Sequence, residues 1–498
     1  MQLITTFNFK IAVATLAAAL LVTGGCGSSM PSPPGQTGSG GSTGTGGQTA
    51  AGGSAGTGGT TGTPAPITIS LSPTGPGRYY GITYDAAGHL YAVGQVASSN
   101  DAKADVATVV AKLTPAGALD TTFGTGGLVV RNLANGTNGE LCRNIVVQST
   151  GKIVVACTVE HAAAADARDR DIAVARFNAD GTKDTTFGAD GIALFDLSTG
   201  VLVGTTFLTD SAWGLARYDD DRLVVHGGQV STRGTDTDFA LMRLTADGAR
   251  DTTFATNGVF NLDTLANGAS NNASPRNATI LPGTDGIIGA GYQPLPGGDT
   301  RPALYKVTDA GVLDTTFATA GVFSTTVLAE QTETYQAVVQ PDAAPATTYH
   351  LVTTGYGRSL DTETTDLLSL RLSSEGVLDP TWGTNGYVRI DVGGFGDNSR
   401  KLVVLPDRRV VLTGGGRPTS ANVDGVVVLL TPDGKPDPTF SSNGFELFDL
   451  GGPADFLWSV ALAPGGKTLA FAGIKGVGTM PTPATAHDDA SILLLPVP

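Results

Sequence analysis

One short phrase occurs six times in this chain and makes it a repeat array. The copies read Asp-Thr-Thr-Phe at 120–123, 184–187, 251–254 and 314–317, Asp-Pro-Thr-Trp at 379–382 and Asp-Pro-Thr-Phe at 437–440. Successive copies start 64, 67, 63, 65 and 58 residues apart. A period of this length, with several short apolar runs in each copy, is typical of arrays in which each unit buries its faces against its neighbours.

Residues 1–25 have the pattern of an export signal, with one positive charge at Lys10, an apolar run at 11–22 and small residues at 23–25. The run from Leu21 to Cys26 resembles a bacterial lipoprotein signal, which implies cleavage before Cys26 and lipid on that cysteine. Gly27 follows where, in such signals, an aspartate favours the inner membrane, so we expect the outer membrane or cell surface. Periplasmic or secreted protein is the alternative.

The segment that follows Cys26 has the composition of a flexible tether. Residues 27–66 contain Gly, Ser, Thr, Ala, Gln and Pro with a single Met30, and no charged or aromatic residue. Such a segment buries too little apolar surface to offset its ordering entropy. We therefore predict a lipidated cysteine and disordered linker over 26–66.

Residues 67–498 are strand-like throughout, with short runs rich in Val, Ile and Leu between clusters of Gly, Asp, Asn and Pro. Superposed repeats give four runs per unit, and the second run ends at one equivalent position in seven units. That position holds Gly94, Cys157, Gly227, Gly291, Gly355, Gly414 and Gly473. The pattern predicts an all-β fold, a seven-bladed β-propeller of four-stranded antiparallel blades.

The two ends of the array indicate how the ring would close. The first run, 67–71, precedes the first unit, and the last unit ends after 491–495 without a fourth run. We expect the N-terminal strand to complete the last blade, because this pairing would hold both termini. In the rival phasing, the first strand is the innermost strand of its own blade.

The repeat pattern resembles the delta-60 repeat family of bacterial exported proteins. The resemblance rests on a Gly-Lys-Ile-Val-Val run at 151–155, an Arg-Phe-Asn-Ala-Asp-Gly turn at 176–181 and Asp-Thr-Thr-Phe-Gly at 184–188, and it covers 67–498. It implies a propeller-like repeat domain and no established activity.

We expect the aromatic residue that ends each phrase to be buried between neighbouring blades. Eight residues before five of the six aspartates stands a cation, namely Lys112, Arg176, Arg243, Lys306 or Arg371, and Leu429 takes this place in the sixth copy. We expect ion pairs here. The alternative is that the carboxylates at these turns bind calcium. No other cofactor is predicted.

A second recurrence places a carboxylate at the start of the third run in five units: Asp171, Asp238, Asp366, Asp424 and Asp489. Two interpretations stay open. Each carboxylate holds its own loop, or together they form an acidic rim that attracts cations or basic partners, consistent with a net charge of −15. The same charge argues against nucleic acid as a partner.

Loop lengths distinguish two classes of connection. Those between the second and third runs, and between the fourth run and the next unit, vary in length, whereas the others are tight. An up-and-down meander places both variable classes on one face, where recognition usually resides.

Cys142 and Cys157 belong to one predicted hairpin. A two-residue loop at 149–150 would set them opposite each other, and export would favour a disulfide. Two buried thiols are the alternative.

The sequence contains no recognisable catalytic or metal-binding motif. We therefore expect a binding or interaction scaffold, tethered to the membrane through its N-terminal lipid, that holds a protein, glycan or small ligand on the variable-loop face. A propeller enzyme acting on polysaccharide, as glycosidase or lyase, and a purely structural surface protein are the alternatives.

Overall fold

The computed structural model describes residues 65–72, 74–101, 104–134, 139–161, 168–264, 272–295, 298–477 and 487–498. The predicted signal peptide, Cys26 and nearly all of the predicted linker lie outside the described residues. In the described part, regular secondary structure is entirely β, which confirms the predicted class. No helix in that part is long and apolar enough to cross a membrane.

The strands fall into four-stranded units, numbered here along the chain. Unit 1 comprises β2 (Gly77–Tyr84), β3 (Leu90–Ala97), β4 (Val106–Leu113) and β5 (Leu128–Arg131). Unit 2 comprises β6 (Leu141–Val147), β7 (Ile153–Glu160), β8 (Arg170–Phe177) and β9 (Ile192–Phe195). Unit 3 comprises β12 (Ser211–Arg217), β13 (Leu223–Val230), β14 (Thr237–Leu244) and β15 (Val259–Leu262). Before it lies a ribbon of β10 (Val201–Val203) and β11 (Thr206–Leu208).

The remaining units follow the same pattern. Unit 4 comprises β16 (Ser274–Ile280), β17 (Ile287–Pro294), β18 (Thr300–Val307) and β19 (Val322–Phe323). Unit 5 comprises β20 (Gln331–Pro341), β21 (Tyr349–Arg358), β22 (Asp366–Ser373) and β23 (Tyr387–Ile390). Unit 6 comprises β24 (Asn398–Val404), β25 (Val410–Thr419), β26 (Asn422–Leu430) and β27 (Phe445–Phe448). Unit 7 comprises β28 (Phe456–Leu462), β29 (Thr468–Lys475), β30 (Asp489–Pro496) and β1 (Ile67–Ile69).

Each unit is an antiparallel meander in which sequential strands are neighbours. Unit 7 has the order β1-β30-β29-β28, and Ile67 lies opposite Ile492. The N-terminal strand thus pairs in the sheet of the C-terminal strands. A single parallel pair, Thr300 with Gln331, joins units 4 and 5 into one eight-stranded sheet.

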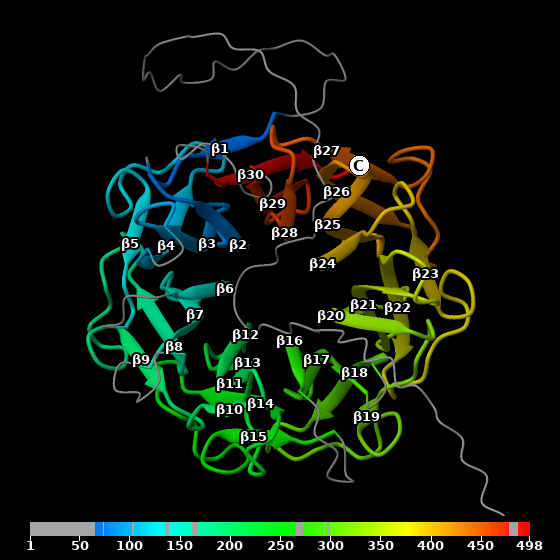
Figure 1. Ribbon diagram of the computed structural model, residues 1–498, viewed down its shortest axis with the longest axis horizontal. Coiled ribbons are helices and arrows are strands. Elements are labelled where there is room, and N and C mark those ends of the chain that lie inside the picture. Colours follow the sequence, from blue (N-terminus) through cyan, green and yellow to red (C-terminus); the bar gives the residue numbers. More distant parts are fainter. Residues whose placement is uncertain are drawn as a thin grey trace, which may run out of the picture.

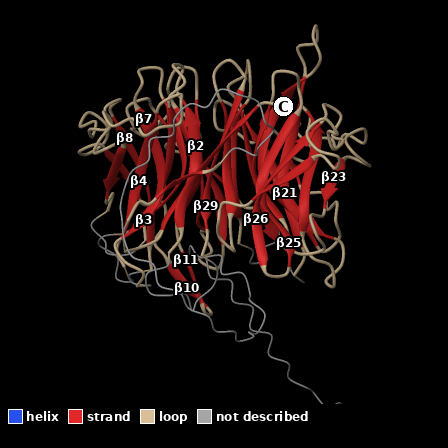
Figure 2. Cartoon of the chain, turned by 90° about the horizontal axis from the view of Figure 1, so that it is seen from above, coloured by secondary structure: helices blue, strands red, loops and turns tan. Residues whose placement is uncertain are grey.

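The units are arranged around a central axis, with the first strand of each unit innermost (Figure 1). Loops emerge at both ends of the strands and form two opposite faces (Figure 2). The innermost strands β2, β6, β12, β16, β20, β24 and β28 surround the central axis, and the region around this axis is called the channel below.

The aromatic residue of the phrase is buried between neighbouring units, as expected. Phe123, Phe187, Phe254, Phe317 and Trp382 are at most 1% exposed, and Phe440 is partly buried. Phe187 packs against the turn of the next unit at Gly248, where an added β-carbon would lie 2.4 Å from the ring. Gly434 has the same relation to Trp382. The phrase therefore couples one sheet to the next through packing.

The predicted ion pairs are present beside these rings. Nitrogen-to-oxygen distances are 3.0, 2.6, 2.8, 2.9 and 2.7 Å for the pairs Lys112–Asp120, Arg176–Asp184, Arg243–Asp251, Lys306–Asp314 and Arg371–Asp379. In the sixth copy, Arg409 contacts Asp437 at 3.4 Å. The arginines also reach the next unit, where Arg176, for example, donates to the Ala246 carbonyl at 2.7 Å.

Candidate ligand-binding site in the central channel

A β-bulge interrupts every innermost strand at the same place, and it creates the site. The register shifts lie at 79/81, 142/144, 212/214, 275/277, 334/336, 399/401 and 457/459. One residue in each first strand is therefore left unpaired. Because the innermost strands line the channel, the bulge repeats one residue of each unit around it (Figure 1).

The recurring glycine is the structural partner of this bulge. Gly94 pairs with Tyr79, the residue before the bulge, and a β-carbon at Gly94 would lie 1.8 Å from the Arg78 carbonyl oxygen. The corresponding distances at Gly227 and Gly414 are both 2.0 Å. The glycine that marked each unit in the sequence thus makes room for the bulged backbone.

The bulged residues alternate between aromatic and arginine around the channel, and we call them the channel ring. Its members, in chain order, are Tyr80, Arg143, Trp213, Arg276, Tyr335, Arg400 and Trp458. Sequence analysis missed this ring. A signal was present, because in four of the seven units the ring residue stands fourteen positions before the recurring glycine or Cys157.

Neighbouring ring members contact each other through aromatic faces. The guanidinium carbon of Arg143 lies 3.6 Å from the Trp213 ring centroid, and that of Arg276 lies 4.0 Å from the same ring. Arg276 and Arg400 flank Tyr335 at 4.7 and 4.1 Å. Stacked guanidinium groups of this kind combine cation–π attraction with N–H donors that point outward in the plane of the group.

On the other side of the ring, Arg400 continues the series toward Trp458, with its guanidinium carbon 5.2 Å from the indole centroid. Trp458 meets Tyr80 edge to face, with centroids 5.1 Å apart. These contacts link six of the seven adjacent pairs of units.

Several donors in the ring are buried without a hydrogen-bond partner among the described residues. They are Nε of Arg276, Nε and Nη1 of Arg400, and Nε1 of Trp458. A buried donor left unpaired costs about 1–3 kcal/mol. All four atoms would be satisfied by an acceptor-rich ligand, and an anion is the strongest acceptor for guanidinium groups.

Charge in the channel has the opposite sign to the charge of the whole chain. Arg143, Arg276, Arg400 and Lys401 supply four cations, and the negative charge of Glu333 interacts with Arg276. The chain as a whole carries −15. A local excess of cations produces a positive potential, which attracts anions.

Lys401 reaches across the channel from β24 to β6, where its Nζ donates to Asn144 Oδ1 at 3.0 Å. Burial lowers the pKa of Lys401 to about 8. Asn144 in turn donates to the Trp213 carbonyl. The lysine thus adds a cation that is close to titration at neutral pH.

Three tyrosines gather beside Arg276 and Arg400. The Tyr335 hydroxyl lies 3.5 Å from that of Tyr292 and 3.3 Å from that of Tyr356. Burial works to raise the pKa of Tyr335, but the two guanidinium groups outweigh burial and lower it. Burial raises the pKa of Tyr292 and Tyr356. The three phenols therefore differ strongly in acidity.

The ring lies toward the face that carries the variable loops, since in most units it is the third residue of the first strand. Both variable classes meet on that face, as expected. In unit 6, the amide of Arg417, near the end of the second strand β25, donates to Asp397, which ends the connection from unit 5. The Gly476 amide donates to Asp455 in the same way in unit 7.

Asp397 and Asp455 hold these connections in place by accepting hydrogen bonds from backbone amides. Asp455 accepts from the amides of Leu450, Gly452 and Gly476. Burial raises the pKa of Asp397 to about 7 and that of Asp455 to about 6.

The five predicted rim aspartates share one register, but most have local partners. Asp171 contacts His161 Nδ1 at 2.8 Å, Asp366 pairs with Arg389, Asp424 accepts from Asn422 at 2.7 Å, and Asp489 lies 3.7 Å from His487. Asp171, Asp238, Asp366 and Asp424 are at most 8% exposed. The local interpretation, in which each carboxylate holds its own loop, fits this burial.

Three groups of acids at this face have a spacing that could hold a metal. They are His161, Asp171 and Asp196; Asp366, Asp391 and Asp397; and Asp424, Asp449 and Asp455. Phrase aspartates belong to none of these groups within the described chain. The calcium prediction at the phrase turns therefore gains no support from the spacing of acids.

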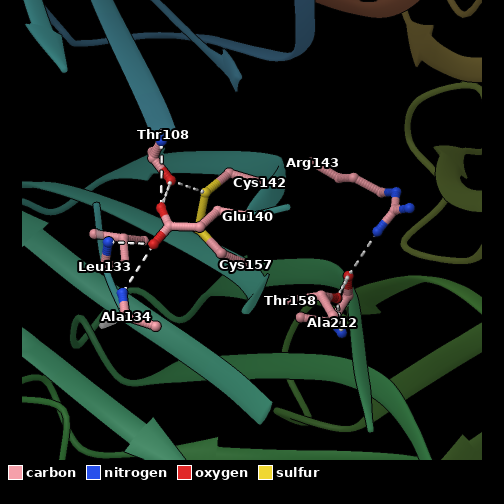
Figure 3. The surroundings of a disulfide bond; sticks show 9 residues. All are labelled: Thr108, Leu133, Ala134, Glu140, Cys142, Arg143, Cys157, Thr158 and Ala212. Carbon is pink, nitrogen blue, oxygen red and sulfur yellow. Dashed lines mark hydrogen bonds between the residues drawn. A yellow bond between two sulfur atoms is a disulfide. The ribbon is translucent and has the colours of Figure 1, made fainter. Parts of the chain in front are cut away.

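The cysteines lie opposite each other in β6 and β7 and form a disulfide (Figure 3). Cys157 occupies the place of the recurring glycine, and Cys142 immediately precedes the ring residue Arg143. Figure 3 shows Arg143 extending toward Ala212, whose carbonyl accepts from its Nη1 at 3.3 Å. The disulfide thus fixes the backbone beside one ring arginine.

Three segments match the family model described as "Domain of unknown function (DUF5122) beta-propeller", at 148–187, 219–254 and 405–440. Each segment spans the second and third strands and the phrase of one unit. These three matches support a β-propeller repeat family. A search of curated proteins gives no match.

The solved structures that match this chain include the following three. A polysaccharide lyase of family PL25, an ulvan lyase, is 12% identical, with a TM-score of 0.45, and the match covers 87% of this chain and 96% of that one. The GH93 α-L-arabinofuranosidase of Fusarium graminearum is 10% identical, with a TM-score of 0.39, covering 71% and 91%. Sqt1 of Chaetomium thermophilum, bound to the N-terminus of ribosomal protein L10, is 11% identical, with a TM-score of 0.42, covering 86% and 100%.

Proposed function

We propose that this protein is an exported, membrane-tethered binding scaffold whose central channel holds an anionic ligand on the channel ring. In this proposal, seven units close into a β-propeller, and a lipid on Cys26 anchors the domain through the linker. Acidic saccharides are the preferred ligand class, because they combine a flat sugar face with carboxylate or sulfate groups.

The single observation that carries the proposal is the alternation of Arg143, Arg276 and Arg400 with aromatic residues at one bulge position per unit. Aromatic faces stack on sugar rings, and guanidinium groups bind carboxylates in bidentate fashion. The unpaired donors of Arg276, Arg400 and Trp458 support a ligand that supplies acceptors.

Other observations support closure and export. The β1–β30 pairing brings the first and last strands of the described domain into one sheet, which favours a closed ring over an open array. A disulfide between Cys142 and Cys157 suits an oxidising compartment outside the cytoplasm. The lipoprotein-type pattern before Cys26 supports the anchor.

A glycan array that contains matched acidic and neutral oligosaccharides tests the proposal. We expect wild-type protein to retain acidic saccharides, and an Arg276→Gln, Arg400→Gln variant to lose them. The matched control is Arg409→Gln, since Arg409 lies near the C-terminal residue Pro498 and away from the ring. Retention of neutral saccharides alone, or an array signal unchanged in the ring variant, would refute the proposal.

A further inference from the structure

The phenol of Tyr335 has an environment unlike that of the other ring aromatics. Arg276 and Arg400 cover it from two sides, with guanidinium carbons 4.7 and 4.1 Å from its ring centroid, and Arg276 Nη2 lies 3.5 Å from its hydroxyl oxygen. Burial and the negative charge of Glu333 favour the phenol, but the two cations outweigh them and favour the phenolate. Tyr335 is 8% exposed, so this interaction is only weakly screened.

Its two neighbours favour the opposite protonation state. Tyr292 and Tyr356 lie on β17 and β21, and each hydroxyl is within 3.5 Å of that of Tyr335. Tyr292 accepts a hydrogen bond from Arg276, and burial keeps both phenols protonated. Titratable groups whose surroundings separate their acidities mark a base and an acid that act together.

We propose that Tyr335 and Tyr356 form an acid–base pair that cleaves uronate-containing polysaccharides by β-elimination, with Arg276 and Arg400 binding the uronate carboxylate. This inference rests on the proposed binding of acidic saccharides in the channel. The two arginines flank Tyr335, so a carboxylate held between them brings the adjacent C5–H bond toward the phenolate.

The step balances without an added reactant. The Tyr335 phenolate takes the proton from C5, and the electron pair of that C–H bond forms the C4=C5 double bond. The bond between C4 and its glycosidic oxygen breaks, and that oxygen takes the proton of the Tyr356 hydroxyl. A proton then returns from Tyr335 to Tyr356 across their 3.3 Å contact. Guanidinium groups stabilise the charge that develops on the carboxylate as C5 loses its proton.

The test uses the purified full chain with polygalacturonate, alginate and hyaluronan, which together present the common uronic acids. Binding is measured by tryptophan fluorescence, since Trp213 and Trp458 are ring members, and turnover by the ultraviolet absorbance of the new double bond. Tyr335→Phe keeps the ring and removes the hydroxyl. We expect it still to retain the acidic polymer and to lower turnover about 100-fold or more. Tyr349→Phe, outside the channel, serves as the matched control.

The pH profile adds a readout that loss of structure would not mimic. Turnover in the wild type should rise with pH as Tyr335 loses its proton and fall as Tyr356 does. Binding of a polymer without formation of the double bond, cleavage by hydrolysis, or full turnover in Tyr335→Phe would overturn the elimination while leaving the binding proposal intact. Failure to bind any acidic polymer would overturn both.

Discussion

The carbonyl oxygen of Arg78 occupies the space that a β-carbon at Gly94 would need, at 1.8 Å. The same relation recurs between Gly227 and Ser211, and between Gly414 and Asn398, at 2.0 Å each. In six of the seven units a glycine thus leaves room for the bulged backbone, and in unit 2 this place is taken by Cys157, which is disulfide-bonded to Cys142. The glycine on the second strand therefore controls the backbone geometry of the bulge on the first strand, which carries the ring residue.

Gly227→Ala should destabilise the protein by about 1–3 kcal/mol, because the new methyl group would meet the Ser211 carbonyl. Urea denaturation gives the free energy of unfolding. Gly396→Ala is the matched control, since its β-carbon would have an ordinary contact of 3.4 Å with Thr365. Equal stability of the two variants would contradict the role given to the recurring glycine.

Phe187→Ala should cost about 3–5 kcal/mol of unfolding free energy, because the ring is fully buried against Gly248 of the next unit. The exposed Leu194, in the outermost strand of the same unit, provides the control. Its change to alanine should alter stability by no more than about 0.5 kcal/mol. Similar losses in both variants would mean that the phrase does not wedge the units together.

The buried acids Asp397 and Asp455 should make stability depend on pH near neutrality. Their folded pKa values, about 7 and about 6, lie above the unfolded value of about 4. Their favourable contribution is complete below about pH 4 and is lost as the pH rises through the folded pKa values. The stability of wild type relative to an Asp397→Asn, Asp455→Asn variant should therefore fall between pH 4 and 7. Urea denaturation across this range measures the difference, and a constant difference would contradict the assignment; the exposed Asp407→Asn is the control.

Lys401 should make ligand binding weaken as the pH rises through about 8, its folded pKa. A cation that becomes neutral in the channel loses a charge-assisted hydrogen bond to an anionic ligand, which corresponds to about tenfold in affinity. Lys401→Met should bind more weakly at pH 7 and show no such dependence. Fluorescence titration with an acidic saccharide measures it, with the exposed Lys467→Met as the control. Identical pH profiles in wild type and Lys401→Met would exclude the lysine from the site.

The features that could be predicted from the sequence are those in which the same residue type recurs at the same position of each unit. The phrase aromatics, their ion pairs and the glycine register all follow from identical residues at identical positions, and the predicted Asp437 copy differs only in taking Arg409 as its partner. The pairing of β1 with β30 followed from counting runs at the two ends. Such features depend on local pattern, which a single sequence displays directly.

The channel ring was missed because its members share a position and not a residue type. Tyr80, Arg143 and Trp213 do not look equivalent until the bulge in each first strand is known. In a regular strand, successive side chains point to opposite faces of the sheet, so the pattern does not distinguish one residue in its middle. A bulge interrupts this alternation, and its position is not visible in the sequence. The five aspartates of the third strands show the converse, since a repeated residue type left two interpretations open, an acidic rim or local loop contacts, and four of the five are buried.

The most direct test of the channel ring as an anion site is a calorimetric titration of one acidic oligosaccharide and its methyl ester. The ester keeps the sugar and removes the charge. We predict that wild type binds the acid and not the ester, and that Arg276→Gln loses about 30-fold in affinity for the acid, since a truncated ion pair costs about 2 kcal/mol or more. Equal affinity for acid and ester, or an unchanged affinity in Arg276→Gln, would contradict the account.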